Sequence, residues 1–271
     1  MNLASNASVG PLLAIGGAED KFRDRLILRK FVELAGGAGA KIVILPTASG
    51  LRDAGQRYQG IFDEFGAASS CVLQVRSREH AFDERYVGQI QASSGIFMTG
   101  GNQVRIAAIL GGSDVGRALV DAHKRGVVIA GTSAGASVMT GIMVAGGDLG
   151  RTPRANLARM APGLGLLDDA IIDQHFRQRD RVARLMTMVS YNPGLLGLGI
   201  DEDTAALIKA DGCIEVLGAG TVLIVDGQQM VSNVHSRRGG SPLNITNATV
   251  HFLTSGSRFD RHSRTAYPST R

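Results

Sequence analysis

The first half of the chain alternates short apolar runs with longer stretches in which apolar residues recur every three or four positions. The short runs end at glycine, proline or polar residues and predict strands, whereas the longer stretches predict amphipathic helices. Such alternation is typical of βαβ units around a parallel sheet. We expect strands at 12–15, 42–45, 71–75, 96–99 and 127–130, and helices at 21–35, 54–65, 84–91 and 104–123.

The pattern changes after about Gly146. The glycine-rich, polar segment 146–165 predicts an excursion from the sheet, to which the apolar run 170–172 returns before a helix at 180–189. The segment 196–225 predicts short strands joined by tight turns. No repeat or low-complexity linker divides the chain, so residues 1–271 are expected to form one domain, with a polar tail after about 240 that is peripheral and partly loose.

Composition excludes the disordered and membrane-spanning classes. Of 271 residues 44% are hydrophobic and 20% are charged, with a net charge of +5, whereas disorder needs low hydrophobicity and high net charge. No stretch approaches the roughly 18 to 20 continuous apolar residues of a membrane span. The first apolar run follows no basic residue and stops at Gly16 and Gly17, unlike a secretory signal. We therefore expect a cytoplasmic protein with no membrane partner.

The basic residues are nearly all arginine, since only five of the 29 are lysine. Arginine suits bidentate recognition of carboxylates and phosphates. The chain nevertheless has neither the G-x-G-x-x-G turn nor the P-loop lysine of nucleotide-binding proteins, so we expect no nucleic-acid partner. Cys71 and Cys213 lie in no metal-ligand spacing and are expected to be buried strand residues.

The most informative chemistry lies at residues 131–135, GTSAG, which match G-x-S-x-G between a predicted strand and a small-residue segment. This is the context of a nucleophile elbow, in which a sharp turn exposes the serine at the carboxyl edge of the sheet. Glycines flank the serine because the turn leaves no room for side chains. The pattern predicts Ser133 as a nucleophile and the backbone N–H of Ala134 as one oxyanion donor.

A serine nucleophile needs a base, and His175 is the best placed of six histidines because it follows a predicted strand. An acid that orients this base is expected after the strand 196–200, where Asp201, Glu202 and Asp203 are adjacent and spacing alone does not choose among them. The GGNQ sequence at 100–103 follows another strand and predicts a second oxyanion donor at Gly101.

Two other classes of protein share parts of this pattern. An α/β-hydrolase esterase has the same elbow, but it would carry an HGGG-type oxyanion loop and a late histidine, here His251 or His262. The GGNQ loop lacks that histidine, which favours His175 as the base. A nucleotide-binding protein would need the G-x-G-x-x-G turn or the P-loop lysine, and this sequence has neither.

Taken together, the chain resembles the cyanophycinases, which belong to the serine peptidase family that also contains aspartyl dipeptidase. Five motifs in consistent order carry this resemblance, and together they are far more specific than any one of them. They are IGGAEDK at 15–21, GGNQ at 100–103, GTSAGA at 131–136, DQHFRQRDRVARL at 173–185 and GIDEDTA at 199–205.

The resemblance implies a fold and an activity. The fold is a flavodoxin-like, class I glutamine-amidotransferase-like three-layer α/β sandwich with a mainly parallel central sheet, assembled as a homodimer. The activity is hydrolysis of cyanophycin, multi-L-arginyl-poly-L-aspartate, at α-aspartyl backbone bonds by a serine-type exopeptidase, which releases β-Asp-Arg dipeptides through an acyl-enzyme. No metal or organic cofactor is needed for this chemistry.

The resemblance also implies residue roles. Ser133 is the nucleophile, His175 the base and Glu202 the orienting acid. Positions that match the substrate site of the family are Gln103, Asp173, Gln174, Arg179, Arg181 and Arg184. The alternative is an aspartyl dipeptidase that acts on small Asp-X peptides, but such an enzyme has no need to recognise arginine side chains, and the arginines around His175 favour the polymer.

Overall fold

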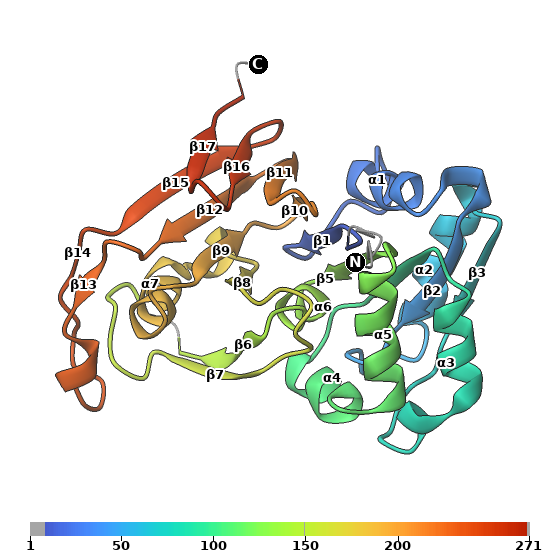
Figure 1. Ribbon diagram of the computed structural model, residues 1–271, viewed down its shortest axis with the longest axis horizontal. Helices are drawn as coiled ribbons and strands as arrows, with labels where there is room; N and C mark the ends of the chain where they lie inside the picture. The colour runs from blue at the N-terminus through green and yellow to red at the C-terminus, as the bar shows by residue number, and fades with distance from the viewer. Residues whose placement is uncertain (1–8, 149, 270–271) are drawn as a thin grey trace, which may run out of the picture.

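The protein is described here by a computed structural model of residues 9–148 and 150–269 (Figure 1). Within these ranges the largest sheet has nine strands in the order β17-β16-β11-β10-β1-β5-β4-β2-β3. The five strands from β1 to β3 in this order are parallel, and β10, β11, β16 and β17 extend the sheet in antiparallel fashion. The strands are β1 (Leu12–Ile15), β2 (Lys41–Leu45), β3 (Ser69–Val72), β4 (Gly95–Met98), β5 (Val128–Thr132), β10 (Thr204–Ile208), β11 (Cys213–Gly218), β16 (Arg258–Asp260) and β17 (Thr265–Tyr267).

Helices cover both faces of the parallel strands. On one face, Phe31 and Phe62 both pack edge-on against Phe97 of β4, with ring centroids 5.5 and 5.3 Å away. On the other face, buried residues such as Ile106 and Leu119 pack against alternate positions of the same strands. The expected α/β class and its helical layers are therefore confirmed, although the central sheet is mixed. The first face carries α1 (Leu26–Leu34) and α2 (Ala54–Glu64); the second carries α3 (Glu84–Gln91), α4 (Gln103–Leu110), α5 (Asp114–Lys124) and α6 (Ala134–Ser137).

A second sheet of four strands, in the order β15-β12-β9-β8, lies on the left of Figure 1. The expectation that 170–172 returns to the first sheet is wrong, because β10 occupies the edge of β1 and leaves β8 to pair with β9. One face packs on α7, and the other contributes Ile172 and Leu198 to the same core cluster as Leu12. The elements are β8 (Ala170–Gln174), β9 (Leu196–Ile200), β12 (Thr221–Asp226), β15 (Thr249–Thr254) and α7 (Val182–Tyr191).

Smaller elements lie around these two sheets. The expected excursion is a hairpin of β6 (Ile142–Gly147) and β7 (Ala158–Pro162), separate from both sheets. A second short pair joins β13 (Val231–Ser232) to β14 (Ile245–Thr246). Single turns of 3-10 helix are η1 (Gly37–Gly39), η2 (His80–Phe82), η3 (Arg177–Arg179) and η4 (Val234–Ser236).

Two helix predictions were wrong in their extent. The first helix begins only at Leu26, because the carboxylate of Asp20 accepts backbone N–H groups of the following turn and Arg25 is left-handed, with φ 49°. Phe22, expected on the buried face, is therefore 93% exposed. The helix expected at 104–123 is two helices, since the chain turns after Leu110 and Ser113 caps α5 by accepting the N–H of Gly116.

The described part of the tail, residues 240–269, is not loose, because β15 pairs with β12, and β16 and β17 pair at the edge of the first sheet. Cys71 and Cys213 lie in strands as expected but are partly exposed rather than buried.

The interpretation that the chain forms a single domain stays a prediction. Residues 1–8, on which the absence of a secretory signal was partly argued, lie outside the described residues. Among the helices of the described ranges, none is long and apolar enough to cross a bilayer.

Candidate active site

Ser133 lies in a sharp turn between β5 and α6. Its backbone adopts φ 53° and ψ −109°, a conformation that non-glycine residues rarely occupy and that costs of order 1–3 kcal/mol. The flanking glycine is required by space, because a Cβ on Gly131 would lie 2.3 Å from the carbonyl oxygen of Gly135. The turn therefore has the shape that the G-x-S-x-G pattern predicts, with the serine side chain at the carboxyl edge of the sheet.

Strand register brings a histidine and a carboxylate together at the same edge. The strands β8 and β9 are parallel, with Gln174 opposite Ile200, so the residues that follow each strand are neighbours. His175 Nε2 lies 2.9 Å from Ser133 Oγ, and His175 Nδ1 lies 2.5 Å from Glu202 Oε1. A hydroxyl, an imidazole and a carboxylate in this order allow the imidazole to take the hydroxyl proton while the carboxylate stabilises the resulting charge.

The three adjacent acids have separate surroundings. Asp201 is buried, and its carboxylate accepts the N–H of Arg177 and both the N–H and the hydroxyl of Thr221. Asp203 accepts the backbone N–H of Asp20. Glu202 is the acid that contacts His175, a choice that spacing alone left open.

The surroundings of His175 favour its neutral form. Burial lowers the pKa of the imidazole below 6.5, because the charged form is poorly solvated there. The hydrogen bond and charge of Glu202 oppose this shift, whereas the cations of Arg179 and Arg181 add to it. The imidazole is thus unprotonated at neutral pH and free to accept a proton from Ser133.

Replacement of Arg179 by glutamine is expected to raise the pKa of His175. Arg179 is exposed, and its charge disfavours the imidazolium, so the neutral variant removes part of the downward shift. The pKa is measured by following the imidazole Cε1–H resonance of His175 by NMR against pH. The exposed Arg57, which pairs with Asp53, gives the control Arg57→Gln, for which no change in this pKa is expected. An unchanged or lower pKa in Arg179→Gln would contradict the electrostatic account.

Two backbone groups lie beside the serine. Ala134 begins α6, and the first N–H groups of a helix have no partner within it. The GGNQ loop approaches from β4, since a Cβ on Gly100 would lie 3.4 Å from Ser133 Cβ. In the same loop, Gln103 Nε2 donates to the carbonyl oxygen of Val144 in β6 at 2.8 Å. The loop therefore lies close to the serine turn, and its Gln103 side chain is fixed to β6.

The residues around His175 form a buried ionic cluster. Asp173 is 0% exposed, and its carboxylate accepts hydrogen bonds from Arg184 Nε at 2.8 Å and from Arg181 at 3.3 Å. Arg181 also donates to the carbonyl of Gln174, and burial lowers its pKa to about 10, so it stays charged at neutral pH. Gln174 Oε1 lies 3.3 Å from Ser133 Oγ. Among the residues expected at a substrate site, Arg179 on η3 is therefore exposed. Asp173 instead faces Arg181 and Arg184 inside the protein.

Removal of the Asp173 carboxylate is expected to destabilise the fold strongly. Asp173→Ala leaves two buried guanidinium groups without their counter-ion, which typically costs about 3–5 kcal/mol. The free energy of unfolding is measured by urea denaturation. The exposed pair of Asp53 and Arg57 gives the control Asp53→Ala, with a loss of about 0.5 kcal/mol or less. Equal losses in the two variants would contradict the buried-cluster interpretation.

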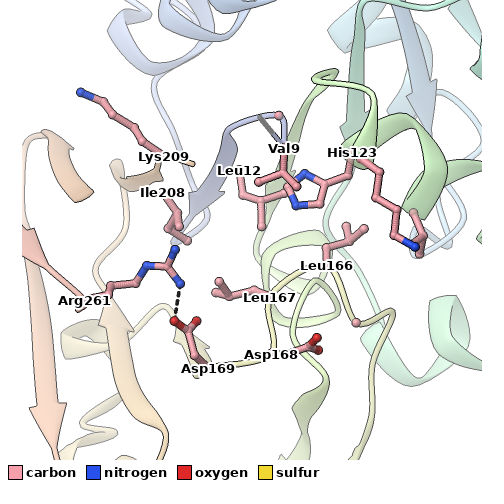
Figure 2. Close-up of a pocket in the computed structure, with 14 residues that line it drawn as sticks. Val9, Leu12, His123, Leu166, Leu167, Asp168, Asp169, Ile208, Lys209 and Arg261 are labelled. Carbon is pink, nitrogen blue, oxygen red and sulfur yellow. Dashed lines mark hydrogen bonds and ion pairs between the residues drawn. The ribbon is translucent and has the colours of Figure 1, made fainter. Parts of the chain in front are cut away.

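The described residues offer no group of three or more His, Cys, Asp or Glu side chains suited to holding a metal ion. Figure 2 shows a cavity lined by His123, Leu166 and Lys209, among others, and crossed by the ion pair of Arg261 and Asp169. Val9 and Gly10 of its lining precede β1, and residues 165–169 precede β8, so it lies at the amino ends of these strands. Ligands of α/β sheets bind at the carboxyl ends, where Ser133 and His175 lie.

Several residues that contact the site were not among those predicted from the sequence. Gly17 packs against the ring of His175, Glu19 accepts a hydrogen bond from Thr132, and Gln178 accepts the N–H of Glu202. Gly17 and Glu19 belong to the IGGAEDK motif, which follows β1 at the same edge of the sheet as the serine. That shared edge was the signal that could have identified them.

Comparison with known proteins places the chain in a family of peptidases. Residues 12–216 match peptidase family S51, and the chain belongs to this family. It is 42% identical to a protein named cyanophycinase from Nostoc sp. (strain PCC 7120). The alignment spans 263 residues and covers 95% of this chain and 88% of that protein. It is 44% identical over 255 residues to a protein of the same name from Geminocystis herdmanii, with 92% of this chain and 93% of that protein covered.

A solved structure supports the fold independently. A peptidase from an acI-B1 Actinobacterium superposes with a TM-score of 0.69 at 20% sequence identity, over 94% of this chain and 98% of that one. At this identity the likeness concerns the fold alone. The membership in family S51 makes the protein a peptidase.

Proposed function

We propose that this peptidase hydrolyses cyanophycin, with Ser133, His175 and Glu202 as its catalytic triad. The observation that carries the proposal is the hydrogen-bonded chain from Ser133 Oγ through His175 to Glu202. Relatives that are 42–44% identical over almost the whole chain and are named cyanophycinase support the choice of substrate.

In this reaction Ser133 attacks the carbonyl carbon of an α-aspartyl backbone bond while His175 takes the hydroxyl proton. His175 then protonates the leaving amine, and the resulting acyl-enzyme is hydrolysed by water with the same histidine as base. Glu202 fixes the tautomer of His175 and stabilises the imidazolium. The backbone N–H groups of Ala134 and Gly101 stabilise the oxyanion that forms at the carbonyl.

The substrate-binding residues follow from the chemistry of the polymer. Each repeat of cyanophycin carries a guanidinium and a free carboxylate, so its recognition needs both cations and acceptors. Arg179 is exposed beside His175 and suits the carboxylate. Asp173 and Arg184 are buried, and Asp173 binds both Arg184 and Arg181, which in turn donates to the backbone carbonyl of Gln174. The proposed substrate site is Gln103, Asp173, Gln174, Arg179, Arg181 and Arg184.

The protein is further proposed to work in the cytoplasm as a homodimer, without a metal or organic cofactor. The triad supplies the nucleophile and the proton transfers, so neither group is needed for the chemistry. Sedimentation velocity measures the oligomeric state, and a monomer at micromolar concentration would contradict the dimer.

The substrate is tested by incubating the purified protein with purified cyanophycin and, in parallel, with an Asp-X dipeptide. We expect release of β-Asp-Arg dipeptides from the polymer, detected by mass spectrometry. Turnover of the Asp-X dipeptide alone would establish an aspartyl dipeptidase instead. Ser133→Ala serves as the control, because any release that persists in this variant comes from a contaminant.

A further inference from the structure

The proposed triad spans two sheets. Ser133 follows β5 of the nine-stranded sheet, whereas His175 and Glu202 follow β8 and β9 of the four-stranded sheet. In the described residues the two sheets share no strand ladder. The distance between the serine and the imidazole therefore depends on whatever joins the two sheets at this edge.

One short segment contributes several backbone hydrogen bonds to that connection. Residues 15–20, here called the β1 loop, leave β1 at the edge where the triad lies. Three successive carbonyl oxygens of the loop each accept a backbone N–H from a triad residue or its neighbour. The bonds are Ser133 N–H to Ile15 at 2.9 Å, His175 N–H to Gly16 at 2.8 Å and Asp203 N–H to Gly17 at 2.9 Å, and Asp20 returns its N–H to Asp203 Oδ1 at 2.8 Å.

Gly17 supports the imidazole directly. Its φ is +100°, and a Cβ at this position would lie 2.4 Å from His175 Cε1 and 2.6 Å from Nε2. Nε2 is the atom that faces Ser133 Oγ. Any side chain at position 17 would therefore push the ring away from the serine or displace the loop, since contacts this short do not occur.

Glu19 supports the serine of the Ser133–His175 pair through the preceding residue, Thr132. Its side chain is buried, and Oε2 accepts the hydroxyl hydrogen of Thr132, the residue before Ser133, at 2.5 Å. Oε1 accepts the hydroxyl of Tyr58 and lies 2.8 Å from Lys21 Nζ. Burial and the charge of Glu19 raise the pKa of Tyr58, so the phenol remains a donor. The carboxylate thus ties the strand that carries the nucleophile to a fixed point in the core.

We propose that the β1 loop sets the distance between Ser133 and His175, with Gly17 and Glu19 as positioning residues of the reaction. This inference rests on the proposed function for the triad and for the identity of the substrate. The loop would act in the same way for any substrate that Ser133 attacks.

Gly17→Ala tests the contact with the imidazole. We expect kcat on cyanophycin to fall about 100-fold, because a displacement of about 1 Å can cost that much, while KM stays within about threefold. Gly37→Ala is the matched control, since Gly37 also has a positive φ, +59°, but a Cβ there would meet nothing within 4 Å. It likewise places a side chain on a residue of positive φ but without touching the site, and its kcat should equal that of the wild type. A fall in kcat of less than about threefold in a folded Gly17→Ala protein would overturn the proposal.

Thr132→Val and Thr132→Ser test the contact with Glu19. The valine has no hydroxyl for Glu19 and should lower kcat about 10-fold with KM unchanged, whereas the serine keeps the hydroxyl and should restore most of the rate. If the contact between Thr132 and Glu19 had a purely structural role, kcat of both variants would fall in proportion to their loss of thermal stability. Equal kcat values for the two variants would overturn the proposal, and this pair decides the matter if Gly17→Ala does not fold.

A second readout separates this proposal from the choice of substrate. The rate at which a fluorophosphonate acylates Ser133 depends on the Ser133–His175 pair and not on cyanophycin. If the wild type is acylated but leaves cyanophycin intact, the proposed substrate fails and the β1 loop remains testable by acylation. If Gly17→Ala and Thr132→Val are acylated as fast as the wild type, the positioning role fails whatever the substrate is.

Discussion

Ser133→Ala is expected to abolish the release of dipeptides from cyanophycin, with kcat lower by about 10⁵- to 10⁶-fold. The hydroxyl of Ser133 is the proposed attacking group, and 2.9 Å separates it from His175 Nε2, the nitrogen proposed to take its proton. Loss of a serine nucleophile or of its histidine base costs about this much in serine peptidases, because the two act as a unit. His175→Ala should therefore fall to the same level, and the double variant should fall no further. Dipeptide release is measured by mass spectrometry at saturating polymer.

The control for this prediction is Ser93→Ala. Ser93 is buried, whereas Ser133 is partly exposed, and Ser93 donates to the carbonyl oxygen of Ile90 at the end of α3, near the amino end of β4. Its substitution should change thermal stability and leave kcat within about twofold. If Ser133→Ala retained more than about 1% of the wild-type rate, the assignment of the nucleophile would be wrong.

Glu202→Gln is expected to lower kcat by about 10³- to 10⁴-fold and to move the acidic limb of the pH profile. The glutamine keeps the shape of the side chain but no longer stabilises the imidazolium or fixes the tautomer. Glu202 raises the pKa of His175 by its hydrogen bond and its charge, so its neutral replacement lowers that pKa further. Because the base works only when neutral, kcat/KM falls as the pH drops through this pKa. The fall should therefore occur at lower pH in the variant than in the wild type.

Glu215→Gln is the matched control for the carboxylate. Glu215 lies on β11 and pairs with Lys209. Its neutral replacement should leave both kcat/KM and the pH profile unchanged. The measurement is kcat/KM against pH for the wild type and the two variants. A shift of the acidic limb to higher pH in Glu202→Gln would contradict the direction of the pKa shift stated for His175.

The elements around the nucleophile could be predicted because their signals are local. A strand, a sharp turn and a helix are encoded in about ten consecutive residues, and the flanking glycines have no other use there. His175 was found for the same reason, since it directly follows an apolar strand. The acid could not be chosen locally, because Asp201, Glu202 and Asp203 are adjacent and their partners come from distant segments, such as Arg177 and Asp20.

The long-range arrangement was predicted less well. The run 170–172 was expected to return to the first sheet, and the tail after about 240 was expected to be partly loose. Both expectations failed because a strand pairs with whichever sheet edge is free. The hydrophobic patterns of β10 and β15 do not show that β10 pairs with β1 and β15 with β12. The helix predicted at 104–123 failed for a different reason, since an apolar period on both sides of Gly111 and Gly112 concealed the turn between them.

By itself the sequence determined the α/β class, the sharp turn at Ser133 and the candidate base at His175, because each depends on the periodicity or chemistry of neighbouring residues. Only the tertiary structure decided which acid reaches the histidine, that Asp173 faces Arg181 and Arg184 inside the protein, and that the loop after β1 joins the two halves of the site. These contacts connect residues that are far apart along the chain. Their formation depends on sheet register and on competition for the same edge, which no short segment specifies.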